Sequence, residues 1–236
     1  MKQWTTRAGT RIIKILGGRS NVFLVSGNGI NLLIDTSPAF MVKRLQKNLR
    51  KHLRGNLDFL VLTHTHFDHA ANTHLIKKIY HPKIVVHTEE SRFLASGDSP
   101  LPAGTNLFSS WLVRNFGRRA SQVVRYTGAV ADINIDKETD LSEYGINVRI
   151  LPTPGHTAGS LSIIIDHELA LVGDALFGAF RRSCLPPFAD DTQELISSWQ
   201  LLLDTGCDLF LPSHGSERTR SILESCMKKE TGKMKH

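Results

Sequence analysis

The sequence predicts a mixed α/β fold in a single domain spanning residues 1–236. Short apolar runs of strand type alternate with segments of helical periodicity. No low-complexity segment, internal repeat or linker divides the chain, and its apolar and charged contents are ordinary. This length and composition are enough for one sizeable hydrophobic core.

The predicted strands are runs rich in Val, Ile, Leu and Phe, bounded by glycine, proline or asparagine. They lie at residues 11–16, 21–27, 30–36, 57–63, 83–87, 146–152, 161–166, 169–174 and 207–212. Tight turns join the first three strands, and Asn28-Gly29 is a hairpin signal. We therefore expect the chain to open with antiparallel strands.

The predicted helices rest on apolar spacing and on end signals. They lie at residues 39–54, 68–80, 106–116, 192–206 and 216–229. In the first helix an apolar stripe includes Leu45 and Leu49, while lysines and arginines lie off the stripe. Asp191 with Glu194 forms a capping box for the fourth helix, and Gly206 closes it.

Composition limits the compartment and the partners. No run approaches the roughly 20 apolar residues of a membrane span, and the N-terminus lacks a signal peptide, so we expect a cytoplasmic protein without a membrane partner. The three cysteines, Cys184, Cys207 and Cys226, are sparse and far apart, which predicts reduced thiols. The net charge of +7 keeps nucleic acid open as a partner, but no aromatic residues interleave with the basic helix. The oligomeric state stays open.

The segment LTHTHFDHAAN, residues 62–72, carries the strongest chemical signal. His64 and His66 are two residues apart in an extended segment, so their side chains emerge on the same side. Asp68 and His69 follow where the chain turns into a helix. Imidazole nitrogen and carboxylate oxygen suit zinc, and also iron or manganese, so this segment predicts a metal site.

Other ligand types follow other predicted strands. His64, His156, Asp174 and His214 each come directly after an apolar run. Loops beyond strand ends are where a rigid scaffold can present side chains to one point. We therefore expect these four residues to converge along one edge of the molecule.

These motifs resemble those of the metallo-β-lactamase superfamily. The H-x-H-x-D-H motif is matched by residues 64–69, and four further motifs follow its order along the chain: Asp35 in LLIDTS, His156 in TPGHTAGS, Asp174 in LVGDALF and His214 in LPSHG. The resemblance runs through nearly the whole chain. It implies a four-layer αβ/βα sandwich with a metal site along one edge.

The resemblance also implies roles for these residues. One metal would be held by His64, His66 and His156, and the second by Asp68, His69 and His214. Asp174 would bridge the two metals, and Asp35 would lie behind them and orient the ligands. The implied enzyme is a hydrolase with two divalent ions, most simply Zn²⁺, in which a hydroxide bridging the metals attacks the substrate. Asp68 would be the catalytic residue that orients the hydroxide or passes a proton.

The family's branches narrow the expected reaction to an ester, thioester or lactone-like bond of a small molecule. Zinc β-lactamases generally lack the bridging aspartate, which is present here as Asp174. Glyoxalase II carries an added helical domain, for which the segment after His214 leaves no room. The lactonases have a tyrosine where this chain has Phe177.

Three alternatives remain open on this scaffold. The first is a nucleic-acid phosphodiesterase resembling ribonuclease Z, which the positive charge would favour. The second is a persulfide dioxygenase with a single iron at the equivalents of His64, His156 and Asp174. The third is a binding protein that keeps the fold and uses metal for structure only.

Two loops are candidates for substrate contact. Residues 104–119 would form a lid, or pack on the core as one face of a helix, through Phe108, Trp111, Leu112 and Phe116. Arg181 and Arg182 either pair with an anionic substrate group or are solvated charges. The remaining histidines are expected to have surface or packing roles: His74, His81, His87 and His167.

Overall fold

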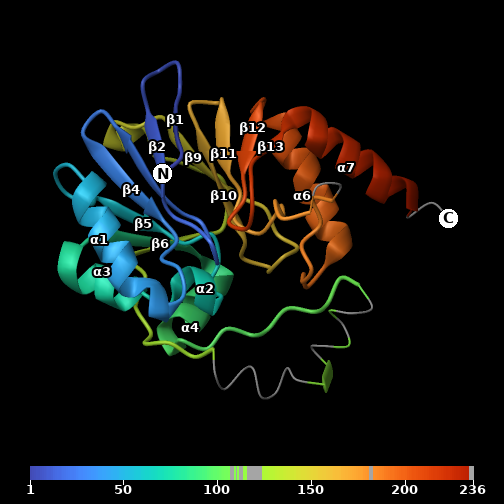
Figure 1. Ribbon diagram of the computed structural model, residues 1–236, viewed down its shortest axis with the longest axis horizontal. Coiled ribbons are helices and arrows are strands. Elements are labelled where there is room, and N and C mark those ends of the chain that lie inside the picture. Colours follow the sequence, from blue (N-terminus) through green and yellow to red (C-terminus); the bar gives the residue numbers. More distant parts are fainter. Residues whose placement is uncertain (107–108, 110, 112–113, 116–123, 181–182, 234–236) are drawn as a thin grey trace.

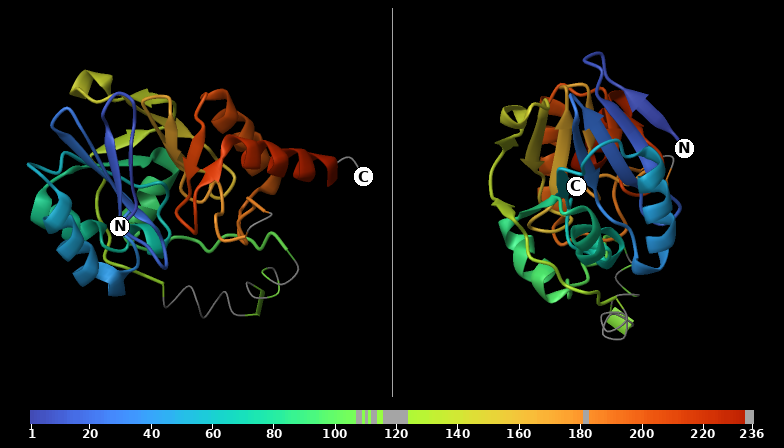
Figure 2. Two further views of the ribbon diagram at one scale, coloured as in Figure 1. Left: turned by 45° about the horizontal axis from the view of Figure 1, so that its top comes forward. Right: turned by 90° about the vertical axis from the view of Figure 1, so that its left-hand side faces the viewer.

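The computed structural model describes residues 1–106, 109, 111, 114–115, 124–180 and 183–233. Two β-sheets face each other, and helices cover their outer faces (Figures 1 and 2). The predicted four-layer αβ/βα sandwich is therefore confirmed. The prediction of a single domain over residues 1–236 stays a prediction.

The first sheet has the order β1-β2-β3-β4-β5-β6-β7. Its strands are β1 (Gln3–Thr5), β2 (Arg11–Leu16), β3 (Val22–Gly27), β4 (Ile30–Ile34), β5 (Phe59–Val61), β6 (Lys83–His87) and β7 (Ile133–Ile135). Neighbours from β1 to β4 pair antiparallel, whereas β4, β5, β6 and β7 pair parallel. The carboxyl ends of β4, β5 and β6 therefore lie at the same edge.

The second sheet has the order β13-β12-β11-β10-β9-β8. Its strands are β8 (Thr139–Asp140), β9 (Val148–Pro152), β10 (Leu161–Ile165), β11 (Leu169–Leu171), β12 (Leu209–Leu211) and β13 (Arg218–Thr219). β11 and β12 are parallel, and β9 runs in their direction because it is separated from β11 only by the antiparallel β10. The ends of β9, β11 and β12 thus also share one edge.

Helices lie on both outer faces. They are α1 (Val42–His52), α2 (Phe67–Ala70), α3 (Thr73–Tyr80), α4 (Thr88–Ser96), α6 (Thr192–Asp204) and α7 (Arg220–Lys233), with short 3₁₀ turns at Ala39–Met41 and Ser142–Tyr144. In Figure 1, α1 and α3 lie to the left of the sheets, and α6 and α7 lie to the right. Among the described residues, no helix has the length and apolar character to cross a membrane.

Three apolar clusters hold the layers together. The middle one lies between the sheets and includes Phe23 and Ile163. A second lies between the first sheet and its helices and includes Leu45 and Leu49, which confirms the predicted stripe of α1. The third packs α6 and α7 on the second sheet around Trp199. Burial of these side chains supplies the main driving force for the fold.

The structure also departs from the predicted elements. The helix predicted over residues 68–80 is divided into α2 and α3, and between them Asn72 donates to the carbonyl oxygens of Thr36 and Ser37 through Nδ2. The prediction missed α4, whose N-terminus is capped when the His87 side chain accepts a hydrogen bond from the Glu89 amide. It also missed the short edge strands β1, β7, β8 and β13, which depend on pairing with distant partners.

The expectation of reduced thiols is wrong for two of the three cysteines. Cys184 and Cys226 form a disulfide that joins the loop after β11 to α7, and their Cα atoms are 6.0 Å apart. Cys207 is a free, buried thiol. Sequence spacing could not reveal this pair, because 42 residues separate the two cysteines and only the packing of α7 brings them together.

Trp199 should contribute strongly to the packing of α6 and α7 on the second sheet. Its side chain is fully buried, and Nε1 donates to the Ala175 carbonyl oxygen at 2.7 Å. We expect Trp199→Ala to lower the free energy of unfolding by about 3–5 kcal/mol, because it leaves a cavity and an unpaired carbonyl. Urea denaturation measures this change. The matched control is Leu201→Ala on the same helix, where 45% exposure of the side chain predicts a loss below about 1 kcal/mol. Equal losses in the two variants would contradict this role for Trp199.

Candidate metal centre

The eight side chains singled out from the sequence come together at the shared edge of the two sheets. Their backbones are tied across that edge, because the Leu161 amide donates to the Thr63 carbonyl oxygen at 2.8 Å. Gly173 permits the close approach, since a Cβ there would lie 2.7 Å from the Thr63 Cβ. Convergence of segments that are distant in the sequence is therefore built into the contact between the sheets.

Asp35 lies at the centre of the hydrogen bonds beneath the cluster. Its fully buried carboxylate accepts from the Thr63 amide at 2.8 Å and from the Thr63 hydroxyl at 2.9 Å. It also accepts from His69 Nδ1 at 2.9 Å and from the Ser213 hydroxyl at 3.2 Å. Asp35 thus orients His69 and connects the loops that carry His64 and His214, as expected of a residue behind the ligands.

Hydrogen bonds fix which nitrogen each imidazole presents. Nδ1 of His156 donates to the Phe188 carbonyl oxygen at 2.9 Å, and Nδ1 of His214 donates to the Arg19 carbonyl oxygen at 2.7 Å. Nδ1 of His64 lies 3.1 Å from the Thr63 hydroxyl oxygen. Since that hydroxyl already donates to Asp35, it accepts from His64. With His69 held by Asp35, four imidazoles present Nε2 to the interior of the cluster.

The inward-facing atoms are close to one another and poorly satisfied. Asp174 Oδ2 lies 3.4 Å from His214 Nε2, 3.6 Å from His156 Nε2 and 3.7 Å from His69 Nε2. Asp68 Oδ2 lies 3.3 Å from His214 Nε2. Three buried atoms of this cluster have no hydrogen-bond partner among the described residues: His64 Nε2, His69 Nε2 and Asp174 Oδ1.

The atoms fall into three groups that could hold a cation, with the ligand atoms of each group within 4.8 Å of one another. The groups are His64–His66–His156, Asp68–His69–His214 and His64–His69–Asp174. The first two are the two ligand sets implied by the sequence motifs. Asp174 contacts members of both sets, as a bridging residue would. Partnerless buried nitrogens beside carboxylates fit a divalent metal, since such atoms are costly to bury otherwise.

The ionisable groups of the cluster have pKa values shifted in two directions. The pKa values of His64, His66 and Asp68 are lowered. Burial, with the neighbouring His69, holds the pKa of His64 well below its ordinary value, and burial with His156 lowers the pKa of His66 to about 3. Burial opposes ionisation of Asp68, yet His69 and His214 lower its pKa to about 2.

The pKa values of His69 and His214 are raised instead. Burial lowers the pKa of each, but the carboxylates outweigh it. Asp68 and Asp174 raise the pKa of His69 to about 9, and Asp174 and Asp68 raise that of His214 to about 11. Without metal, protons on these two imidazoles therefore balance the carboxylates at neutral pH.

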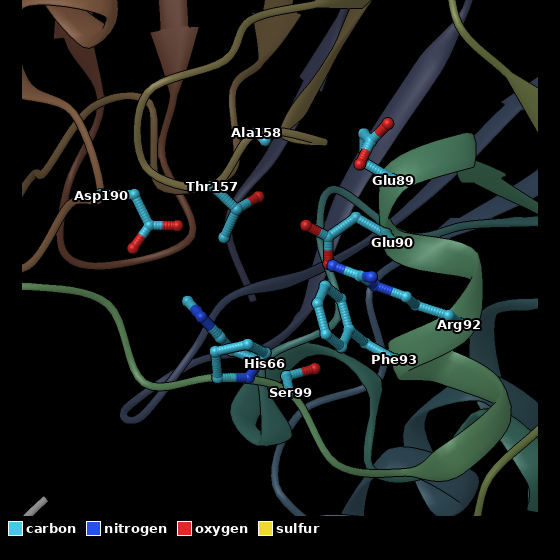
Figure 3. A pocket seen from close by; sticks show the side chains of 10 residues that line it. His66, Glu89, Glu90, Arg92, Phe93, Ser99, Thr157, Ala158 and Asp190 are labelled. Atoms are coloured by element: carbon cyan, nitrogen blue, oxygen red, sulfur yellow. The ribbon is translucent and has the colours of Figure 1, made fainter.

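A pocket of about 250 Å³ opens beside His66 (Figure 3). Helix α4 lines one side with Glu89, Glu90, Arg92 and Phe93. The other lining residues are His66, Ser99, Pro100, Thr157, Ala158 and Asp190. The pocket therefore lies directly beside the first ligand set and has room for part of a small molecule.

Sequence reasoning missed the contribution of α4 to this pocket. The sequence does carry a signal for this contribution, because a polar segment follows the predicted strand at residues 83–87. Since β6 pairs parallel with β5, that segment begins at the same edge of the sheet as His64 and His66. Five residues expected in the lid or in substrate contact lie outside the described part of the chain: Phe108, Leu112, Phe116, Arg181 and Arg182. Trp111, from the same lid segment, is 47% exposed.

Comparisons with known proteins agree with this geometry. The family model described as the metallo-beta-lactamase superfamily matches residues 15–214. In sequence, the chain is 28% identical over 204 residues to a probable metallo-hydrolase of Methanocaldococcus jannaschii, covering 84% of this chain and 89% of that protein. In structure, it superposes with a TM-score of 0.67 on an archaeal metallo-beta-lactamase superfamily protein of Sulfolobus tokodaii, at 21% identity, covering 94% of this chain and 86% of that one.

Two further relatives have names that specify a reaction. A hydroxyacylglutathione hydrolase of Haemophilus influenzae is 29% identical over 214 residues, covering 88% of this chain and 91% of that protein. A human acyl-coenzyme A thioesterase is 28% identical over 225 residues, covering 86% of this chain and 76% of the human protein. The first match corrects the sequence argument against a glutathione-thioester hydrolase. A protein of that name matches this chain over nearly its whole length, so an added helical domain does not separate the two.

Metal binding should release protons from the cluster. His69 and His214 are protonated at neutral pH without metal, because their pKa values are raised to about 9 and about 11, and a bound cation requires neutral imidazole. We expect Zn²⁺ binding to release about one proton from each and to tighten as the pH rises from about 6 to about 9. Calorimetry in buffers of different ionisation enthalpy measures the release.

The control for proton release is His167→Gln, a change at an exposed histidine outside the cluster, which should release as many protons as the unmodified protein. Zinc affinity that stayed constant over this pH range would contradict the assigned protonation.

Proposed function

The chain belongs to the metallo-β-lactamase superfamily, and on that premise we propose that it is a hydrolase with two divalent cations that cleaves an ester, thioester or lactone-like bond of a small molecule. The observation that carries the proposal is the cluster itself. Two complete ligand sets share Asp174, and buried Nε2 atoms in the described chain lack partners. A site of this composition suits Zn²⁺.

The proposed ligands are His64, His66 and His156 for one cation and Asp68, His69 and His214 for the other, with Asp174 between them. Divalent cations bound at such a site would lower the pKa of a water molecule from its bulk value to roughly 7 and would polarise a carbonyl oxygen. No serine or cysteine nucleophile is then required.

Asp68 is the proposed catalytic residue. Its side chain is 21% exposed, whereas His69 beside it is fully buried, so Asp68 faces the open side of the cluster. The carboxylate oxygen of Asp68 that does not bind the cation can accept a proton from an attacking water. Oδ2 lies 3.3 Å from His214 Nε2, so the two side chains are placed to bind the same cation.

Three observations support a small acyl substrate, and together they favour a thioester over an ester or a lactone. The pocket beside His66 has a volume of about 250 Å³, which suits a small group. Two relatives are named as a hydroxyacylglutathione hydrolase and an acyl-coenzyme A thioesterase. Phe177 packs its ring against His214, with 5.4 Å between ring centroids, so this position supplies no hydroxyl of the kind expected in the lactonases.

Metal content and substrate screening test the proposal together. We expect close to two zinc-type ions per chain after reconstitution and turnover of a thioester or ester, with Asp68→Ala lowering kcat by about 100-fold or more. The screen also includes lactone, phosphodiester and persulfide substrates. Fewer than about 1.5 ions per chain, or iron with oxygen consumption on a persulfide, would overturn the hydrolase. Turnover of phosphodiesters alone would instead assign the chain to nucleic-acid processing.

Filling the pocket beside His66 should weaken substrate binding. Ala158 lines the pocket and is exposed, so a tryptophan there can project into the cavity without disturbing the core. We expect Ala158→Trp to raise KM by about 10-fold with little change in kcat, since it removes binding common to the ground and transition states. Steady-state kinetics measure both constants, and zinc content should stay unchanged.

The control for the pocket variant is Ile222→Trp on α7, which is 37% exposed and does not line the pocket. Its KM should match that of the unmodified protein. An unchanged KM in Ala158→Trp would exclude this pocket from substrate binding.

A further inference from the structure

Thr65 lies between His64 and His66 and is fully buried. Its amide donates to Glu90 Oε2 at 2.9 Å, and its hydroxyl donates to the same oxygen. Its carbonyl oxygen accepts from the Ser99 hydroxyl at 2.6 Å and from the Tyr126 hydroxyl at 2.7 Å. Every polar atom of Thr65 is therefore bound by a side chain from another part of the molecule.

Glu90 is the charged member of this set. It lies in the first turn of α4 and is 3% exposed, so its carboxylate is almost completely removed from water. Both donors from Thr65 reach Oε2, and charge-assisted bonds of this kind are the strong ones in proteins. Gly159 packs against the side chain, because a Cβ there would lie 2.5 Å from Glu90 Cγ. Glu90 is thus held in place on both sides.

The carbonyl side of Thr65 is held by two hydroxyls. Burial is the largest of the effects that raise the pKa of Tyr126 to about 12, so its hydroxyl stays protonated and can donate. Tyr126 is itself anchored, since its amide donates to the Gly97 carbonyl oxygen at 3.0 Å just after α4. Ser99 also contacts the Thr65 hydroxyl, with 2.8 Å between the two oxygens.

We propose that Glu90, assisted by Ser99 and Tyr126, is a positioning residue that fixes the peptide between His64 and His66 and thereby sets the geometry of the first ligand set. The inference rests on the proposed metal site. It adds to that site a group that is not one of the proposed ligands and that acts through its hydrogen bonds to Thr65.

Glu90, Ser99 and Tyr126 form a clamp on Thr65, and a physical reason links this clamp to the ligands. Two histidines separated by one residue share that residue's two peptide units, so rotation of either unit moves an imidazole. Glu90 and the two hydroxyls fix the amide and carbonyl of Thr65 at once. Glu90 and Ser99 also line the pocket beside His66 (Figure 3), so the residues that hold Thr65 border the same pocket as a proposed ligand.

Titration with Co²⁺ tests the role, because cobalt absorption reports ligand geometry directly. We expect Glu90→Ala to weaken Co²⁺ binding by about 10-fold or more, as loss of an outer hydrogen-bond partner commonly does, and to alter the visible spectrum. Glu90→Gln keeps an acceptor oxygen for Thr65 and should restore most of the affinity. Tyr126→Phe leaves Ser99 on the carbonyl and should have a smaller effect.

The controls are chemically matched and lie elsewhere. Glu230→Ala removes another buried glutamate, which pairs with Lys233 on α7, and Tyr144→Phe removes a tyrosine hydroxyl from the 3₁₀ turn. Both variants should bind Co²⁺ like the unmodified protein and give its spectrum. Thermal melting of each metal-free variant separates a loss of fold from a loss of ligand geometry.

The outcomes distinguish the inference from the proposed function. If the unmodified protein bound no Co²⁺, the proposed function would fail. If it bound Co²⁺ and Glu90→Ala matched it in affinity and spectrum, only the positioning role would be overturned. A lower melting temperature with an unchanged cobalt spectrum would likewise assign Glu90 to structure alone. Should Glu90→Ala not fold, Thr65→Val and Ser99→Ala give the same comparison, and unchanged affinity and spectrum in both would overturn the role.

Discussion

The candidate site depends on the hydrogen bonds that the Asp35 carboxylate accepts from four donor groups. A fully buried carboxylate is stable only when donors surround it, and here they come from the end of β5, from α2 and from the loop after β12. Asp35 itself takes the left-handed conformation, with φ of 61°. This strained residue therefore joins the two sheets at one point and orients His69 by the same bonds.

A second constraint is the balance of charge above Asp35. Five imidazoles and two carboxylates crowd a buried region where unpaired ionised groups are unfavourable. Without metal, protons on His69 and His214 offset the carboxylates, while His64 and His66 stay neutral because burial lowers their pKa values. Bound divalent cations would satisfy the same atoms without those protons. The cluster is thus arranged for positive charge from outside the chain.

The layers of the fold hold these groups in place. Strands β4, β5 and β6 are parallel, and β9, β11 and β12 share one direction, so their ends meet at a single edge. The three apolar clusters between the layers fix the sheets and helices relative to one another. Helix α4 adds Glu90 to the edge and forms one side of the pocket. Ligand geometry and substrate access therefore depend on the same packed elements.

The amino-acid sequence by itself determined most strands and the histidines and aspartates that form the candidate metal centre. Strand patterns and the H-x-H-x-D-H segment are local, since a few neighbouring residues specify the backbone or the chemistry. It also placed the stripe of α1 and the cap at Asp191, which depend on contacts within one or two turns. Tertiary structure alone decided the bond between Cys184 and Cys226, the edge strands and the clamp of Glu90 on Thr65. Each of these joins residues that are distant in the chain, and no local pattern encodes which distant surfaces will pack together.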